Sequence, residues 1–314
     1  MRIRFGVQNM RHNGWGAAIG DADPNADRLP LLIERLAPLE LDLLVLNETR
    51  SRTRRRWPQT WQRRLHRLAD ALGLRIAGIT PTKTRTPSAL LYRARTMGHP
   101  IWWDTSLRTM FGHGYGVAAF TVPGLPLPMC AGAVHFTPFN IGVAEAEATT
   151  LVSRVYRKGS IGAFGGDFNF PLYGSDPNWD QALPHNIMLR AIVNGGANGA
   201  LAETDIWLPD GTLNPAVDLQ PNYKVADAIA RGDCHDAAWE LYKRTRSTGA
   251  PDETLLQATG AHTRVDAIAV TGALRPALTT YSVAATPPGA SDHAAVTCMI
   301  DTERWNSQRK FLYR

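Results

Sequence analysis

The chain has 314 residues, 44% of them hydrophobic, and a net charge of +6 at pH 7 with an isoelectric point near 9.4. This length and hydrophobic content allow a large core, and we expect one domain over 1–314 because no Ser/Gly-rich or purely charged stretch divides the chain. No apolar run is long enough for a signal peptide or a membrane span, and the three cysteines follow neither disulfide nor zinc-binding spacing. We therefore expect a soluble, cytoplasmic protein.

The first part of the chain is predicted to alternate strands and helices. Residues 2–9 (RIRFGVQN) form a short strand, and the apolar spacing of 29–36 is typical of a helix. The continuous apolar run of 41–48 (LDLLVLNE) indicates a strand buried on both faces. An apolar stripe over 61–72 predicts a second helix, with most of its arginines on the solvent-facing side: Arg63, Arg64 and Arg67.

Further strands are predicted in the second part of the chain at 88–94, 116–122, 129–136, 264–270 and 294–300. A helix over about 143–158 leads into the stretch IGAFGGDFNF at 161–170. Residues 171–262 are rich in Asn, Pro, Asp and Gly, so we expect a long irregular insertion there, with a helix only at 233–244.

Polar residues lie at or beside the ends of these predicted strands: Asn9, Glu48, His135, Asp167 with Asn169, Asp266, and the pair Asp292 and His293. Strand ends that meet at one edge of a rigid sheet can bring several such side chains together. We therefore predict a functional site on one rim of the sheet scaffold.

The stretch GGDFN has two interpretations. In extended backbone Asp167 and Asn169 point to the same side, while Phe168 and Phe170 point to the other and anchor the strand in the core. The first interpretation is a carboxylate and an amide aimed at one ligand. The second is an ordinary Asx turn at a strand end, which an isolated GDxN favours.

The acidic residues of the predicted rim favour the first interpretation. Glu48, Asp167, Asp266 and Asp292 would repel one another by roughly 4 kcal/mol per pair at about 4 Å with an effective dielectric constant of about 20. A hard divalent cation, Mg²⁺ with Mn²⁺ as the alternative, matches an oxygen-rich ligand set and leaves positions open for water and phosphate.

Six segments, in this order, resemble the motif set of the endonuclease/exonuclease/phosphatase superfamily, the deoxyribonuclease-I-like fold: VQN at 7–9, LDLLVLNE at 41–48, VHFTPFN at 134–140, GGDFN at 165–169, TRVDAIAV at 263–270 and SDHAAV at 291–296. Each motif is weak alone, but the ordered set spans nearly the whole chain. The resemblance implies an α/β fold: a four-layered α/β sandwich of two mixed β-sheets packed face to face, with outer helices.

The resemblance also implies which residues hold a Mg²⁺ ion. Glu48 would be the principal metal ligand, with Asn9 beside it and Asp292 also near the metal. The residue before Glu48 is Asn47, where many members of the superfamily have glutamine, and we expect this difference to matter little.

The same resemblance implies the catalytic residues. Asp167 would activate or orient the attacking water, and Asn169 would hold a phosphate oxygen. His293 would contact the scissile phosphate and transfer protons, with Asp266 bonded to its far ring nitrogen. His135 would be a second phosphate-facing histidine and a candidate general acid. Which of these groups is the general base stays open.

An arginine-rich segment begins two residues after Glu48, and we expect it to bind phosphates that flank the scissile one: Arg50, Arg52, Arg54, Arg55 and Arg56. Tyr115, in FGHGYG, has two equal interpretations, a loop contact to a sugar or base and a residue of a plain turn.

Three functions follow. The first is a Mg²⁺-dependent phosphodiesterase that acts on DNA or RNA. The second is the same chemistry on a small phosphoester such as an inositol phosphate, a nucleotide or a lipid head group, with lipid the least favoured because no membrane-docking stretch is visible. The third is a member that binds nucleic acid without catalysis, against which the retained catalytic residues argue. His135 also argues against cleavage at abasic sites, since the endonucleases that cut there generally lack this histidine.

Overall fold

The computed structural model describes residues 1–14, 27–50, 58–84, 86–138, 140–156, 161–170, 223–245, 255–256, 262–263, 265–284 and 290–308. Their strands form two six-stranded sheets. The first sheet has the order β13-β14-β1-β2-β4-β3, with β1 Arg2–Asn9, β2 Leu43–Asn47, β3 Arg75–Ile79, β4 Ala89–Tyr92, β13 Leu278–Ala284 and β14 Ala295–Asp301. Its β1–β2 pair is parallel and the other pairs are antiparallel, so the sheet is mixed.

The second sheet has the order β5-β6-β7-β8-β12-β9, with β5 Pro100–Asp104, β6 Tyr115–Phe120, β7 Met129–His135, β8 Gly162–Asp167, β9 Cys234–Asp236 and β12 Asp266–Thr271. Here β7 and β8 are parallel and the remaining pairs are antiparallel. Two further short strands, β10 Leu255–Leu256 and β11 His262–Thr263, pair with each other.

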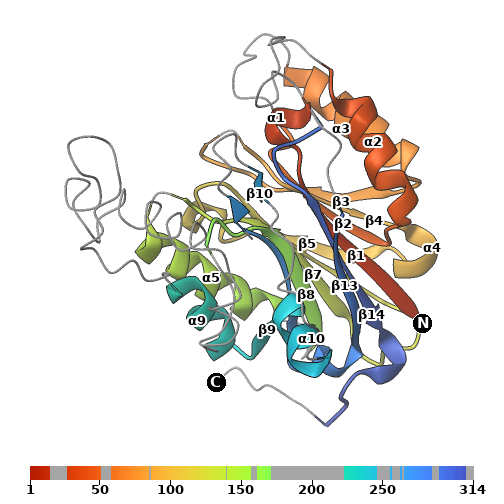
Figure 1. Cartoon of the computed structure of the whole chain (residues 1–314), viewed down its shortest axis with the longest axis vertical. Coiled ribbons are helices and arrows are strands. Elements are labelled where there is room, and N and C mark those ends of the chain that lie inside the picture. The colour runs from red at the N-terminus through yellow and green to blue at the C-terminus, as the bar shows by residue number, and fades with distance from the viewer. Residues whose placement is uncertain are drawn as a thin grey trace.

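The two sheets pack face to face between two layers of helix (Figure 1). Alternate residues of both sheets, such as Phe5, Val45, Ala131 and Ile268, fill the central core. The outer face of the first sheet packs on α2 Leu29–Leu36 and α3 Pro58–Ala71, and that of the second on α5 Ile141–Val155 and α9 Lys224–Arg231. The predicted four-layered sandwich is thus confirmed.

The remaining helices are short: α1 Arg11–Gly14, α4 Ala94–Met97, α10 Ala237–Thr245 and the 3-10 helices Ala37–Leu39, Arg108–Met110, Arg275–Ala277 and Thr302–Arg304. Among the described residues, no helix combines the length and the apolar character that crossing a membrane requires.

The expectation of an irregular insertion at 171–262 is wrong for residues 223–245. These residues form α9, β9 and α10, of which α9 packs on α5 and β9 is the edge strand of the second sheet. The helix expected at 233–244 begins only at Ala237, after β9. Residues 171–222, 246–254 and 257–261 lie outside the described part of the chain.

Arg64 is buried, which corrects the prediction of a solvent-facing side chain. Its guanidinium donates to the Asn13 carbonyl oxygen at 3.1 Å and to Asp27 Oδ1 at 2.8 Å. The side chain therefore ties α3 to the segment after Asn9. Arg63 and Arg67 are exposed, as predicted.

Replacing Arg64 by leucine should lower the free energy of unfolding by roughly 1–3 kcal/mol, because a buried carbonyl and a carboxylate lose their donor. Urea unfolding of the variant measures this. Arg63→Leu on the same helix is the matched control, and it should stay within about 0.5 kcal/mol of wild type, since Arg63 is exposed. Equal losses in the two variants would contradict a specific role for Arg64.

Candidate active site

The candidate site continues the central core at one end of the sandwich. Every second residue of a strand faces the space between the sheets. In β1 these inward residues are Ile3, Phe5, Val7 and, at the end, Asn9. The last inward positions of the neighbouring strands are polar in the same way, and they are Asn47 in β2, His135 in β7, Asp167 in β8 and Asp266 at the start of β12. Apolar pairing thus sets the register that brings these residues together.

Asp167 lies in the middle of this group and is buried. Its Oδ2 accepts a hydrogen bond from Asn9 Nδ2 at 3.0 Å, and its Oδ1 accepts one from the Asn169 N–H at 2.9 Å. Burial raises the pKa of Asp167, because the charged form loses its hydration. The carboxylate is thereby a better proton acceptor than an exposed aspartate.

Asn169 does not continue the strand. β8 ends at Asp167, and Asn169 has a φ of +55°, so the two side chains do not share a face through extended backbone. The bond from the Asn169 N–H to Asp167 Oδ1 is that of an Asx turn, while Asn169 Nδ2 donates to the Phe136 carbonyl oxygen at 2.8 Å. The Asx-turn interpretation of GGDFN is therefore confirmed, and the turn lies within the polar group. That both side chains are aimed at one ligand stays a prediction, and Phe168 and Phe170 are buried as expected.

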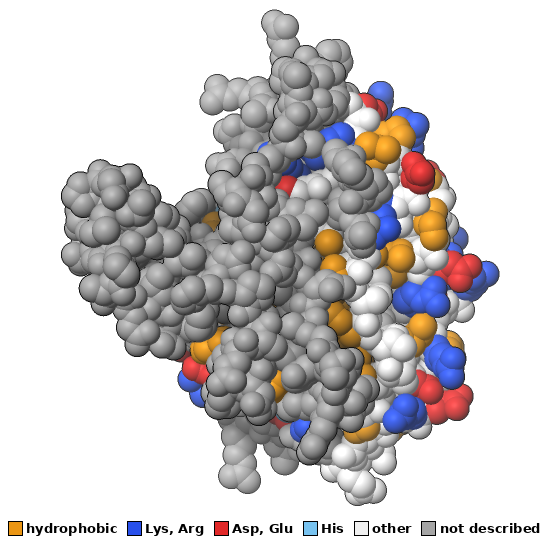
Figure 2. Space-filling model, in the orientation of Figure 1, with side chains coloured by type: hydrophobic (Ala, Val, Ile, Leu, Met, Phe, Trp, Pro, Cys, Tyr) orange, Lys and Arg blue, Asp and Glu red, His pale blue; other side chains and the backbone are white. Residues whose placement is uncertain are grey.

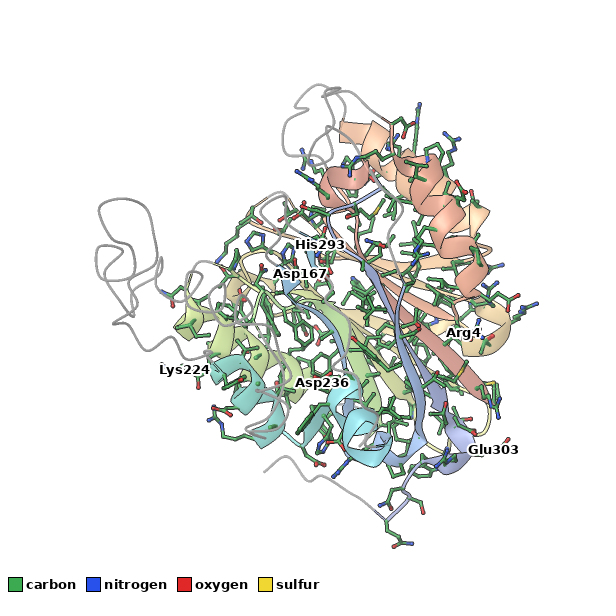
Figure 3. The ribbon with its side chains drawn as sticks, viewed as in Figure 1. Arg4, Asp167, Lys224, Asp236, His293 and Glu303 are labelled. Atoms are coloured by element: carbon green, nitrogen blue, oxygen red, sulfur yellow. The ribbon has the colours of Figure 1, made fainter. Side chains whose placement is uncertain are left out.

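Asp266 and His293 form a pair beside Asp167. His293 Nδ1 lies 2.7 Å from Asp266 Oδ2, and Asp266 is directly opposite Asp167 in the β12–β8 register. Burial alone would lower the pKa of His293, but the Asp266 carboxylate, with Asp167 and Asp292 nearby, raises it to about 10. His293 is therefore protonated at neutral pH. Figure 3 shows Asp167 and His293 side by side, far from Asp236 and Glu303.

His135 differs from His293 in charge. Its Nε2 lies 3.6 Å from Asp167 Oδ2, and its ring stacks on that of His113 with the centroids 4.6 Å apart. His113 is itself held through Nδ1 by the hydroxyl groups of Thr84 and Thr86. Burial lowers the pKa of His135 to about 4, so the ring is neutral at pH 7. A neutral imidazole suits hydrogen bonding to a phosphate better than the general-acid role expected for it.

The predicted metal ligands lie on the same rim. Glu48 directly follows β2 with a φ of +53°, and its charge acts on both His135 and Asp167. Asp292 lies 3.5 Å from Arg11 through Oδ2, while its buried Oδ1 accepts no hydrogen bond from the described residues. An acidic group that includes the buried Asp292 Oδ1 fits a hard divalent cation.

Asp167, Asp266 and His293 also present ligand atoms that all lie within 4.8 Å of one another. His293 Nδ1 and Asp266 Oδ2 already bind each other, which leaves these atoms unsuited to holding a cation. The geometry of this trio therefore suits proton transfer better than it suits holding a cation.

The predicted substrate contacts have mixed outcomes. Tyr115 as a loop contact is wrong, because it is the first residue of β6, fully buried and stacked on Phe111 with ring centroids 4.6 Å apart. Arg50 lies half-buried two residues after Glu48. The other four predicted arginines lie outside the described residues: Arg52, Arg54, Arg55 and Arg56.

Sequence reasoning missed two residues of the site. Arg11 lies two residues after Asn9 and contacts Asp292, a position that the NxR spacing at the end of β1 could have indicated. Asn47 was noted only as a difference from the glutamine of many superfamily members, yet its side chain is fully buried and hydrogen-bonded to both sheets. Its place before Glu48, at the end of an inward-facing alternation, was the available signal.

No protein-family model and no curated protein matches the sequence. Solved structures do resemble this one. An endonuclease/exonuclease/phosphatase from Bacteroides vulgatus has a TM-score of 0.59 and 15% identity over 96% of this chain and 99% of that one. D. rerio TDP2, solved with a single-strand DNA product, has a TM-score of 0.57 and 12% identity over 96% and 99% of the two chains.

ANGEL2, a 2′,3′-cyclic phosphatase, has a TM-score of 0.58 and 13% identity over 96% of both chains. At such low identity these likenesses establish the fold alone. They agree with the motif set from which a four-layered sandwich was predicted.

Proposed function

We propose that this chain, which has the fold of the endonuclease/exonuclease/phosphatase superfamily, is a metal-dependent phosphodiesterase that hydrolyses nucleic acid. The observation that carries the proposal is the Asp266–His293 pair at 2.7 Å beside the buried carboxylate of Asp167. A protonated imidazole oriented by one carboxylate and placed next to another is the arrangement of a proton-transfer site. A protein that only binds nucleic acid has no use for it.

The residues that would hold a Mg²⁺ ion, or Mn²⁺ in its place, are Glu48 and Asp292, with the Asn9 amide beside them. When bound, such an ion polarises a phosphoryl oxygen and offsets charge that develops in the transition state. It would also offset the repulsion among the carboxylates of the rim.

The chain's own residues divide the remaining steps between them. Asp167, with its raised pKa, accepts a proton from the attacking water and orients that water through the oxygen facing Asn9. His293, protonated and held by Asp266, donates to the scissile phosphate. His135 and Asn169 hold phosphate oxygens from the β7 and β8 sides of the group.

The choice of nucleic acid rests on charge and on one structural relative. The sequence is basic, and an arginine run follows Glu48 directly. TDP2, which has the same fold, was solved with single-strand DNA. Elsewhere charge is mixed, since basic and acidic side chains alternate over the described part of the face in Figure 2. The likeness to ANGEL2, a 2′,3′-cyclic phosphatase, supports a second candidate substrate, a small or terminal phosphoester such as a 2′,3′-cyclic phosphate.

A salt titration should separate these two substrates. Chelator should abolish hydrolysis of plasmid, linear duplex, single-stranded DNA or RNA, whichever is cut, and Mg²⁺ or Mn²⁺ should restore it. For a nucleic acid held by about three phosphate contacts, KM should rise roughly 40-fold between 50 and 200 mM salt, because binding releases condensed counterions. Hydrolysis of bis(p-nitrophenyl) phosphate, which has no flanking phosphates, should change less than about twofold.

The contradicting outcomes are distinct. Hydrolysis that continues unchanged in the presence of chelator would contradict the proposed metal dependence. Equal salt dependence on polymer and small diester would favour the small phosphoester. Inertness of the metal-loaded protein towards all of these substrates would overturn the proposed activity.

A further inference from the structure

The Asn47 side chain connects three elements in two sheets. Its Oδ1 accepts a hydrogen bond from the Asp167 N–H at 2.8 Å, and its Nδ2 donates to the Val134 carbonyl oxygen at 2.8 Å. The same Nδ2 donates to Ser88 Oγ at 2.7 Å, just before β4. Asn47 itself belongs to β2, so two of the three bonds cross from the first sheet to the second.

Both cross-sheet bonds end at the backbone of, or next to, a residue of the candidate site. The Asp167 N–H belongs to the proposed proton acceptor, and Val134 precedes His135. Asn47 precedes Glu48, and its carbonyl oxygen accepts the Met10 N–H directly after Asn9. One amide thus joins the strand ends that carry the metal side of the site, in the first sheet, to those that carry the proton-transfer side, in the second.

The approach of the strands around this amide is close. Gly166 has a φ of +153°, and a Cβ at that position would lie 1.7 Å from the Val134 carbonyl oxygen and 3.3 Å from Asn47 Oδ1. A glycine is therefore required for β8 to reach the Asn47 amide without pushing β7 away. The bonds fit at normal lengths only with this local geometry.

An apolar side chain, or one that only accepts hydrogen bonds, could not make the same link. The inward residues before Asn47 are apolar, Leu43 and Val45, and apolar packing holds two sheets together without fixing their relative position to fractions of an ångström. Hydrogen bonds are directional and short. Asn47 supplies an acceptor towards Asp167 and a donor towards Val134 at the same time, which neither a leucine nor an ionised aspartate can do.

We propose that Asn47 is a positioning residue, whose amide sets the separation between Glu48 in the first sheet and Asp167 and His135 in the second. This inference rests on the proposed function. Misplacing reacting groups by about an ångström can cost on the order of 100-fold in rate, so Asn47 should act on turnover although it touches no substrate.

Three variants test the proposal in the full chain with Mn²⁺ and the best substrate found. Asn47→Leu keeps the branching and number of heavy atoms, removes both cross-sheet bonds together with the bond to Ser88, and should lower kcat roughly 100-fold with KM within about threefold. Ser88→Ala leaves both cross-sheet bonds intact and should stay within about threefold of wild type. Thr302 is buried at the other end of the first sheet, and Thr302→Val removes its partly buried bond to the Met1 carbonyl oxygen; this variant controls for loss of stability and should leave kinetics unchanged.

Asn47→Asp keeps the acceptor for the Asp167 N–H and turns an oxygen towards the Val134 carbonyl oxygen. This variant replaces Asn47→Leu if that protein does not fold. We expect it to lower kcat tenfold or more while the near-UV circular dichroism spectrum stays that of wild type. The Mn²⁺ concentration for half-maximal activity should rise in both Asn47 variants, a change that a general loss of stability does not produce.

The two failures are distinguishable. Suppose that Asn47→Leu keeps activity within threefold of wild type, or that Asn47→Asp does so where Asn47→Leu does not fold. That result would overturn the positioning role of Asn47 and leave the proposed function standing. A Thr302→Val variant with the same kinetic loss would also overturn it, since stability alone would then explain the effect. Wild-type protein inert on every phosphodiester would overturn the proposed function and this inference with it.

Discussion

Replacing Asp167 by asparagine is expected to lower kcat for phosphodiester hydrolysis about 1,000-fold, because the amide cannot accept the proton of the attacking water. The fold should persist. The amide satisfies only one of the two donors that the carboxylate binds, Asn9 Nδ2 and the Asn169 N–H. It also removes a buried charge whose burial raises the pKa of Asp167, so the free energy of unfolding should stay within about 1 kcal/mol of wild type.

Steady-state kinetics with saturating Mg²⁺ and urea unfolding measure the two effects. Asp236→Asn is the matched control, since Asp236 is a buried aspartate of the same sheet at the other end, where its Oδ1 accepts the Ala238 N–H. It should retain full activity. A loss below tenfold in Asp167→Asn would rule Asp167 out as the proton acceptor.

Removing the His293 imidazole should be as damaging as removing the Asp167 carboxylate. We expect His293→Ala to lose about 1,000-fold in kcat, Asp266→Asn about 100-fold, and the double variant no more than His293→Ala alone, because Asp266 acts through the imidazole. A double-mutant cycle measures this coupling. Losses that multiply would show that the two residues act independently.

The pH profile gives a second readout of the same pair. Burial opposes the charge on His293, and the Asp266 carboxylate outweighs it to raise the pKa to about 10. Without that carboxylate the pKa falls, and His293 loses its proton at a lower pH. The alkaline limb of the Asp266→Asn profile should therefore move to lower pH than that of wild type, and a limb that does not move would contradict the assignment of His293 as the proton donor.

The site could be predicted from the sequence because its residues end strands that are themselves easy to recognise. The apolar run of 41–48 and the alternation of 2–9 fix which positions face inward, and Asn9, Glu48, Asp167 and Asp266 follow at the strand ends. The order of six short motifs then indicated the sandwich, which the structure confirms.

The predictions that were wrong or missing share one physical cause, which is contact between segments that lie far apart in the sequence. The helical pattern places Arg64 on the solvent-facing side, but the side chain is buried where it donates to Asp27 and to the Asn13 carbonyl oxygen. Tyr115 follows glycines and reads as a turn, yet it opens β6 and stacks on Phe111. Four unpredicted strands lie at sheet edges, where alternation is short, weak or interrupted: β3, β5, β9 and β13.

The position of β1 in the sheet has a consequence for folding during translation. β1 lies inside the first sheet, and its antiparallel partner is β14, with Arg2 opposite Asp301. Pairing across so long a stretch of chain forms late and slowly in folding. On the ribosome, the strand that carries Asn9 emerges well before its partner β14 and the adjacent His293. The proposed activity towards nucleic acid, including the protein's own message, would therefore be absent until β14 has been synthesised and paired with β1.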